Sequence, residues 1–315
     1  MRNILVLSLF LFPFYITTAA AQDNGAKAAT GLHQSVTPDS AKAKKSSLKT
    51  GITYNSNSVF LARTDSVATA VFNFGVTYTL KSGIFFSGTV NYVPSRQFDK
   101  LDGGSAETGY NYEKDNFSAG VTLSKYFAAF NSTQLISALD ATLGAEVSYD
   151  INDIVTPSAH VDYALVKSGG NDFILTGGLE HEFTIDKPFA AKDKLSIEPA
   201  VHLNAGTQNF YNTYYTRQQA SLQARINAKS KGRGKGVVTT TAVTQVTPTT
   251  TSASKFQVLA YEFSLPFTYS VKKVSAEFLP VYALALHKID DNGTNTFYLP
   301  NSSVFYVQVA LSYTF

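Results

Sequence analysis

The feature that most constrains this chain is an apolar period of two that recurs from Leu48 to the C-terminus. Between Phe305 and Phe315, apolar or aromatic side chains occupy every second position, and mostly small or polar side chains lie between them. The same alternation recurs in residues 72–80, 139–149 and 259–271. A period of two indicates β-strands with two different faces. These runs are about 10–15 residues long, whereas strands of globular proteins typically have about 5–6 residues.

Long amphipathic strands rich in Tyr and Phe are typical of a membrane β-barrel, whose outer face contacts lipid and whose inner face contacts water. A large soluble β-sandwich also has alternating strands and is the alternative. The chain has 18 Tyr and 23 Phe but only 16% charged residues, well below the roughly 25% of soluble domains. We therefore predict an all-β fold, a closed antiparallel transmembrane β-barrel.

The pattern predicts about twelve strands, since bacterial single-chain barrels have an even number. Their expected ranges are 48–60, 67–80, 84–96, 104–113, 117–128, 136–149, 154–166, 172–185, 194–212, 255–271, 274–288 and 302–315. Alternation is weakest in 104–113. Short periplasmic turns are expected at 81–83, 114–116, 150–153, 186–193 and 272–273. Longer outer loops are expected at 97–103, 129–135, 167–171, 213–254 and 289–301.

The N-terminus has the pattern of a secretory signal peptide over residues 1–21. Arg2 precedes an apolar stretch, and Ala19 to Ala21 offers a cleavage site. The alternative, a membrane anchor, would need a longer apolar run. Residues 22–47 are small, polar and lysine-bearing, which predicts a disordered periplasmic tail before a barrel at 48–315.

These features resemble bacterial outer-membrane β-barrel proteins: the export signal, the amphipathic strands and a last strand ending on the aromatic Phe315. The resemblance implies an outer-membrane location after cleavage near Ala21, and recognition of the terminal strand by the barrel-assembly machinery. It covers the architecture of 48–315 and brings no functional motif. The chain has no Cys, which excludes disulfides, thiolate metal sites and cysteine nucleophiles. We expect no cofactor.

The predicted loop 213–254 is unusual because it is basic and lacks acidic residues. Its charged residues are Arg217, Arg225, Lys229, Lys231, Arg233 and Lys235. Such a patch could contact lipopolysaccharide phosphates or another polyanion, or fold into the barrel as a constriction. The alternative is a solvated, disordered loop. Nucleic-acid binding does not suit the expected compartment.

The predicted inner face carries many acids. They are Asp140, Glu146, Asp162, Glu180, Glu182, Glu198, Glu262 and Glu277. His160, His202 and His287 share this face, and strand counting places His160, Glu180 and Glu198 at similar depth. Three interpretations remain open: a hydrated lumen, a cation-favouring passage, or a metal-binding or pH-sensitive site. We assign no metal ligands.

The function expected from these features is a porin-like passive channel for small solutes with an acidic, cation-favouring lumen. One alternative is a non-conducting surface barrel whose outer loops bind a partner or lipopolysaccharide. Another is a rim hydrolase, because His287 lies near Asp290 and Asp291 at a predicted outer strand end. We favour a turn for that segment, find no Gly-x-Ser-x-Gly motif, and predict no enzyme activity.

Overall fold

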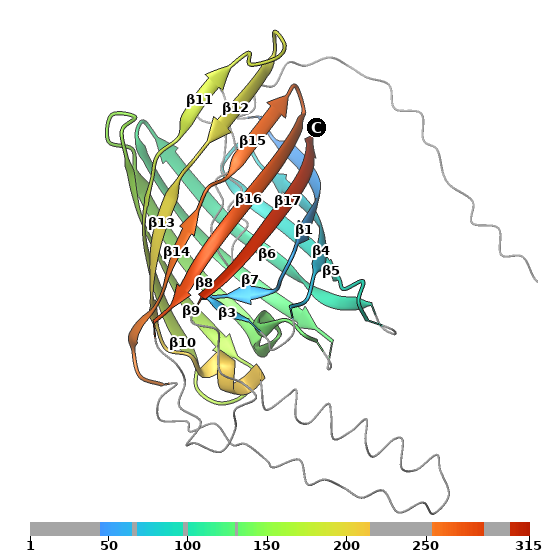
Figure 1. Cartoon of the computed structure of the whole chain (residues 1–315), viewed down its shortest axis with the longest axis vertical. Helices are drawn as coiled ribbons and strands as arrows, with labels where there is room; N and C mark the ends of the chain where they lie inside the picture. Colours follow the sequence, from blue (N-terminus) through green and yellow to red (C-terminus); the bar gives the residue numbers. More distant parts are fainter. Residues whose placement is uncertain (1–44, 65–67, 97–99, 130–131, 215–253, 287–302) are drawn as a thin grey trace, which may run out of the picture.

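The computed structural model describes residues 45–64, 68–96, 100–129, 132–214, 254–286 and 303–315. Neighbouring strands pair antiparallel, and the last strand, β17 (Ser303–Thr314), pairs with the first, β1 (Ser47–Asn55). This pairing closes the sheet, so the protein is a closed antiparallel barrel of 12 strands, as predicted (Figure 1). In the part of the chain described here, no helix has the length and apolarity to cross a membrane.

Most of the spanning strands are continuous. Besides β1 and β17, they are β4 (Val71–Thr79), β5 (Ile84–Tyr92), β6 (Leu101–Lys114), β7 (Phe117–Ala128), β8 (Leu139–Tyr149), β9 (Thr156–Val166) and β16 (Val274–Ala285). The weakest predicted strand, 104–113, is β6, which has 14 residues and pairs along both edges.

Three spanning strands are each interrupted once, which the sequence analysis did not predict. β10 (Asp172–Glu180) continues as β11 (Phe183–Asp186), β12 (Asp193–Ile197) as β13 (Ala200–Gly206), and β14 (Gln257–Ser264) as β15 (Phe267–Val271). Pro199 and Pro266 lie in two of the breaks, where their missing N–H groups interrupt the ladder. The segments still connect across the breaks, since the Glu198 N–H donates to the Pro266 carbonyl at 3.1 Å.

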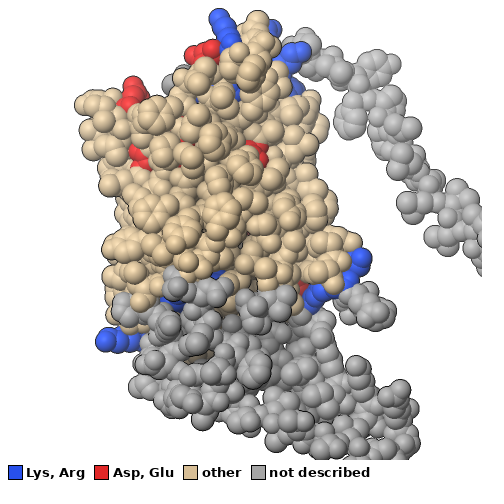
Figure 2. All heavy atoms as spheres, viewed as in Figure 1, with Lys and Arg blue, Asp and Glu red and all other residues tan. Residues whose placement is uncertain are grey.

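The outer face of the wall is apolar and the inner face is mostly small and polar. Phe74, Leu123 and Phe305 point outward and are 47%, 53% and 64% exposed. Figure 2 shows one face of the barrel, with a middle band free of charged side chains and with Lys and Arg gathered at the two ends. Thr77 and Ser124 lie on the inner face and are buried. This is the pattern of a barrel whose outer band contacts lipid.

The predicted short turns lie at the barrel end that carries the C-terminus (Figure 1). They connect β4 to β5, β6 to β7, β8 to β9, β11 to β12 and β15 to β16. Asp115 and Lys272 have φ values of 52° and 56° in the two tightest turns. Because short turns face the periplasm in outer-membrane barrels, we name this the periplasmic end and the opposite side the outer end.

The outer ends of three predicted strands differ from the structure. The strand predicted at 48–60 ends at Asn55 and is followed by a hairpin, β2 (Val59–Phe60) and β3 (Arg63–Thr64). The strand predicted at 136–149 starts at Leu139, after a short 3₁₀ helix, η1 (Leu135–Ala138). The strand predicted at 194–212 ends at Gly206, and residues 209–214 are helical. These segments pack inward instead of extending the wall.

Candidate functional site

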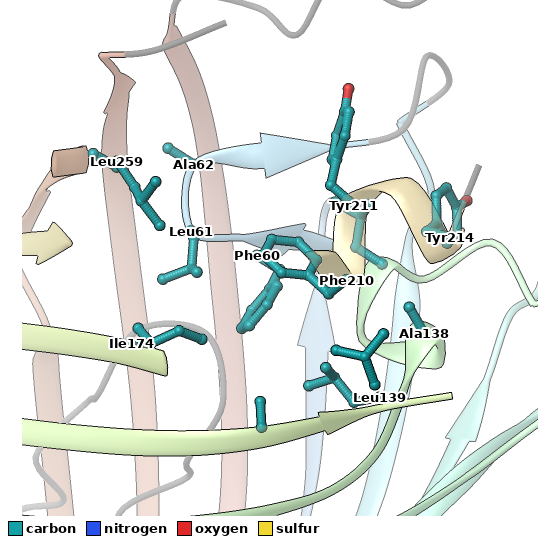
Figure 3. Close-up of a cluster of buried hydrophobic side chains, with 14 of the residues drawn as sticks. Phe60, Leu61, Ala62, Ala138, Leu139, Ile174, Phe210, Tyr211, Tyr214 and Leu259 are labelled. Carbon is teal, nitrogen blue, oxygen red and sulfur yellow. The ribbon is translucent and has the colours of Figure 1, made fainter. Parts of the chain in front are cut away.

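Three segments pack together inside the outer end of the barrel, and we call them the plug: the β2–β3 hairpin, η1 and the helical residues 209–214 (Figure 3). They share one buried apolar cluster with the barrel wall. The rings of Phe60 and Phe210 meet edge to face, with centroids 4.6 Å apart. Both side chains are almost completely buried. Apolar contact between segments far apart in the chain therefore stabilises the docked position of the plug.

The tip of the β2–β3 hairpin inserts apolar side chains at the cost of backbone strain. Leu61 and Ala62 have φ values of 49° and 56°, a left-handed conformation that costs about 1–2 kcal/mol per non-glycine residue. Two-residue hairpin turns of this kind usually carry Asn-Gly. Leu61 and Ala62 are instead buried in the plug, and this burial offsets the strain.

Two β-bulges turn wall residues toward the plug. The register shifts between Leu139 and Ala141 in the β8–β9 pairing, and between Asn204 and Ala205 in the β13–β14 pairing. A bulge inserts one extra residue and so changes which side chains face inward. Leu139 and Leu259 are fully buried in the cluster (Figure 3). Strict alternation placed both on the lipid face, and that prediction is wrong.

Asp172 anchors the helical segment 209–214 from the first residue of β10. Its Oδ1 accepts hydrogen bonds from Thr207 Oγ1 at 2.6 Å and from the Asn209 N–H at 2.7 Å. Its Oδ2 accepts from the Phe210 N–H at 2.7 Å. Asp172 is fully buried. A carboxylate at this position satisfies N–H groups of the first helical turn and interacts favourably with its dipole.

Asp102, near the outer end of β6, anchors residues 132–134, which lead into η1. Its Oδ2 accepts hydrogen bonds from Ser132 Oγ at 2.7 Å and from Gln134 Nε2 at 2.6 Å. Arg96 forms an ion pair with its Oδ1 at 2.5 Å. Asp102 is 1% exposed, so a buried, paired charge holds the loop that leads into η1.

Arg63 brings a positive charge into the plug. It is fully buried, and its Nε donates to Gln208 Oε1 at 3.1 Å. Burial lowers the pKa of Arg63 to about 10, although nearby Tyr211 opposes the shift. The guanidinium is therefore still charged at neutral pH. This contact joins the hairpin to the segment just before residues 209–214.

A cavity of about 290 Å³ lies beneath the plug, against β1, β4, β5, β6, β7, β16 and β17. Among its described lining residues, seventeen are Ser, Thr, Asn or Gln. The charged ones are Lys49, Asp102, Glu107 and Glu277. Phe60 and Ile136 of the plug line it as well. The structure thus contains a mainly uncharged polar chamber below an apolar cap.

Several predicted acids and histidines lie on the inner face of β8, β9, β13 and β14, strands that do not line the chamber. His160 Nε2 lies 2.9 Å from Asp162 Oδ2, and His160 Nδ1 lies 3.8 Å from Glu146 Oε2. His202 is directly opposite Glu262 in the β13–β14 pairing. Its ring lies against Gly178, where an added Cβ would be 2.7 Å from His202 Cδ2. The alternation of side chains along the strands therefore predicted the inner face correctly for Glu146, His160, Asp162, His202 and Glu262.

The predicted depths were less accurate than the predicted faces. His160 lies opposite Thr176, whereas Glu180 lies opposite Thr156 and Ala200. His160 and Glu180 therefore lie at different heights. Residues that are equally far from the ends of their strands are displaced relative to one another by the shear of the barrel. Glu198 is buried at the break before Pro199. The described residues contain no group of three or more His, Cys, Asp or Glu that could hold a metal ion.

Asp140 does not face the lumen, and that prediction is wrong. It lies at the β8 bulge, and its Oδ1 is 2.7 Å from Lys125 Nζ. Lys125 alternates with the exposed outward residues Leu123 and Phe127. The ion pair is therefore on the outer surface of the barrel, near its outer rim. Glu182, also predicted inside, lies in a strand break and pairs with Lys194 at 3.2 Å.

The plug residues Asp102, Asp172 and Arg63 were not predicted, because the sequence places them in loops or at strand ends and does not indicate their partners. Glu107 was also not predicted, although parity along β6 places it inward with Ser105 and Gly109. Several predicted features lie outside the described residues. They include the signal peptide at 1–21, the tail up to residue 44 and the outer loop 289–301. They also include the rim residues His287, Asp290 and Asp291, and the basic patch Arg217, Arg225, Lys229, Lys231, Arg233 and Lys235.

No family model and no curated protein matches the sequence. Solved structures with a similar fold include the KdgM porin, at 8% identity over 85% of this chain and 99% of that one, with a TM-score of 0.44. LpxR from Salmonella typhimurium is 11% identical over 85% and 99%, with a TM-score of 0.42. An outer membrane channel from Pseudomonas putida F1 is 9% identical over 89% and 100%, with a TM-score of 0.41. Similarity at this level assigns neither a family nor an activity.

The structure itself fixes the class of protein. A closed barrel with an apolar outer band, a polar interior and short turns at one end is the architecture of bacterial outer-membrane proteins. The protein is an outer-membrane β-barrel.

Proposed function

We propose that the protein is a porin-like channel for small polar solutes whose outer mouth opens and closes by movement of the plug. The observation that carries this proposal is the polar chamber of about 290 Å³ directly beneath the plug. A barrel that served only as a scaffold would be expected to fill this space with side chains, as the smallest barrels do. The chamber is a solute path in which the plug is the main obstruction.

We also propose that the lumen favours cations over anions. Glu146, Asp162 and Glu262 lie on the inner face of the wall, on strands that do not line the chamber. Acidic groups along a pore attract cations and repel anions. Among the described residues that line the chamber, the basic one is Lys49. Arg63 and Arg96 belong to the outer segments.

Recordings from the refolded protein in planar bilayers test both parts of the proposal. We expect infrequent openings of small conductance and a reversal potential of the cation-selective sign across a salt gradient. A reversal potential of the opposite sign at neutral pH would contradict the cation preference. Silence at every voltage, including in variants with a weakened plug, would contradict the channel itself.

The plug also favours a second candidate, a non-conducting surface barrel. Its apolar cluster is continuous with the wall, as expected of a permanently closed structure. In that case the outer surface would contact lipopolysaccharide or a partner, and the barrel would serve as their platform. The bilayer recordings distinguish the two candidates, since only the channel conducts after the plug is weakened. In either case we expect the assembly machinery to recognise the strand that ends at Phe315.

A further inference from the structure

The wall of the chamber is organised in rows by the strand register. Thr53 on β1 lies opposite Asn73 on β4, which lies opposite Asn91 on β5. Neighbouring strands are about 4.8 Å apart, so one hydroxyl and two amides follow one another across the wall. In the next row toward the periplasm, Gly51 lies opposite Gly75. These two glycines leave the wall without side chains there and deepen the chamber.

Of the four charged residues that line the chamber, Asp102 pairs with Arg96, and Glu277 interacts electrostatically with Lys49. Glu277 accepts a hydrogen bond from Gln308 Nε2 at 3.3 Å, and Glu107 accepts one from Ser105 Oγ at 3.1 Å. Lys49 adds a positive charge on the periplasmic side of the glycine row. A charged solute held here would lose water without gaining a strong counter-charge, which is unfavourable.

The uncharged groups suit a different solute. Asn and Gln side chains both donate and accept hydrogen bonds, and so do Ser and Thr hydroxyls. A solute hydroxyl has the same double capacity, so amides and hydroxyls can satisfy it in several orientations. At the outer side of the chamber, Phe60, Tyr126 and Tyr306 provide aromatic surface. Such surface can cover the C–H face of a solute while the amides bind its hydroxyls.

From this arrangement we propose that the chamber binds a neutral, polyhydroxylated solute about the size of a mono- or disaccharide. Its volume of about 290 Å³ is close to the lower limit of small-molecule sites, which span roughly 300–1,000 Å³. The inference extends the proposed function, because the bound solute would be the one that the channel passes. Binding itself does not require the plug to open.

Isothermal titration calorimetry on the refolded full chain in detergent micelles tests the proposal. The probes are maltose as a neutral disaccharide, glucuronate as an acidic sugar and glucosamine as a cationic one. We expect saturable binding of maltose, and affinities for glucuronate and glucosamine that are lower by about tenfold or more. Absence of maltose binding, or tighter binding of either charged sugar, overturns the proposal.

Variants locate the binding site. Asn73→Leu and Asn91→Leu keep side-chain size but remove the amide, and each should weaken maltose binding about tenfold, the effect of one lost hydrogen bond. Asn111→Leu is the matched control: Asn111 also faces inward, next to Gly120, but lies outside the chamber lining. Unchanged binding in both Asn73→Leu and Asn91→Leu overturns the assignment. Because two positions are tested separately, the assignment can still be tested if one of the variants fails to fold.

The outcomes also separate this inference from the channel. Conductance without maltose binding leaves the channel intact and overturns the solute class. Maltose binding without conductance supports the site and overturns the channel.

Discussion

Removing the carboxylate of Asp172 should release the plug without unfolding the barrel. Asp172 accepts hydrogen bonds from Thr207, Asn209 and Phe210 while fully buried. In Asp172→Ala, three donors lose their shared acceptor. A lost helix cap costs about 0.5–2 kcal/mol, and a lost hydrogen bond to a charged group about 1.5–3 kcal/mol. Because these contacts exist only when residues 209–214 are docked, most of the loss falls on the closed state.

A destabilisation of the closed state by about 2 kcal/mol corresponds to about a 30-fold increase in the open-to-closed ratio. Open probability in single-channel recordings measures this ratio directly. Asp172→Asn retains one acceptor oxygen, so its effect should be smaller. Asp186→Ala is the control, because Asp186 is exposed on β11 at the periplasmic end. An open probability that is unchanged in Asp172→Ala, with the barrel folded by circular dichroism, would refute gating by this plug.

Three further predictions concern the plug and the wall. Phe210→Ala leaves a void in the fully buried cluster and should raise open probability more than Asp172→Ala, since truncating a buried Phe to Ala costs about 3–5 kcal/mol. An effect no larger than that of an exposed alanine substitution would argue against the cluster. The double variant Leu61→Asn/Ala62→Gly should relieve the strain of the hairpin turn. It should still increase conductance, because it removes two apolar side chains that are buried in the plug. Reduced conductance would show that turn strain affects the stability of the docked plug more than burial does. Gly178→Ala should lower the unfolding midpoint in urea by a stability loss of about 1–3 kcal/mol, because the new methyl group would lie 2.4 Å from Ser158 Oγ and 2.7 Å from the His202 ring. An unchanged midpoint would mean that both side chains can move aside.

The wall could be predicted from the sequence because each spanning residue faces either lipid or lumen. In β7, for example, the predicted range 117–128 matches the structure. Whether a position carries an apolar or a polar side chain then depends only on which face of the strand it occupies. This alternation can be read from one strand at a time. The same reasoning placed His160, Asp162 and Glu262 on the inner face. Relative height failed because it depends on the shear of the whole barrel.

The plug could not be predicted in this way because its contacts join distant segments. Arg63 and Gln208 are 145 positions apart in the chain, and Phe60 meets Phe210 from a different loop. No local period marks such pairs. Bulges also break the parity rule without a clear sequence signal. One extra residue near Asp140 was enough to move that carboxylate from the predicted lumen to the outer surface.

The inner wall itself indicates that the closed arrangement is a property of the fold and not of the loops alone. At the outer end, Leu139, Ile174 and Leu259 point inward and are buried against the plug (Figure 3). In a permanently open pore these side chains would face water, at a cost of about 1.5–3 kcal/mol for each large one. Toward the periplasm the inner face is polar, as at Thr77 and Ser87, whose hydroxyls are 2.9 Å apart. The change from polar to apolar along the same inner surface therefore marks the height at which the plug docks.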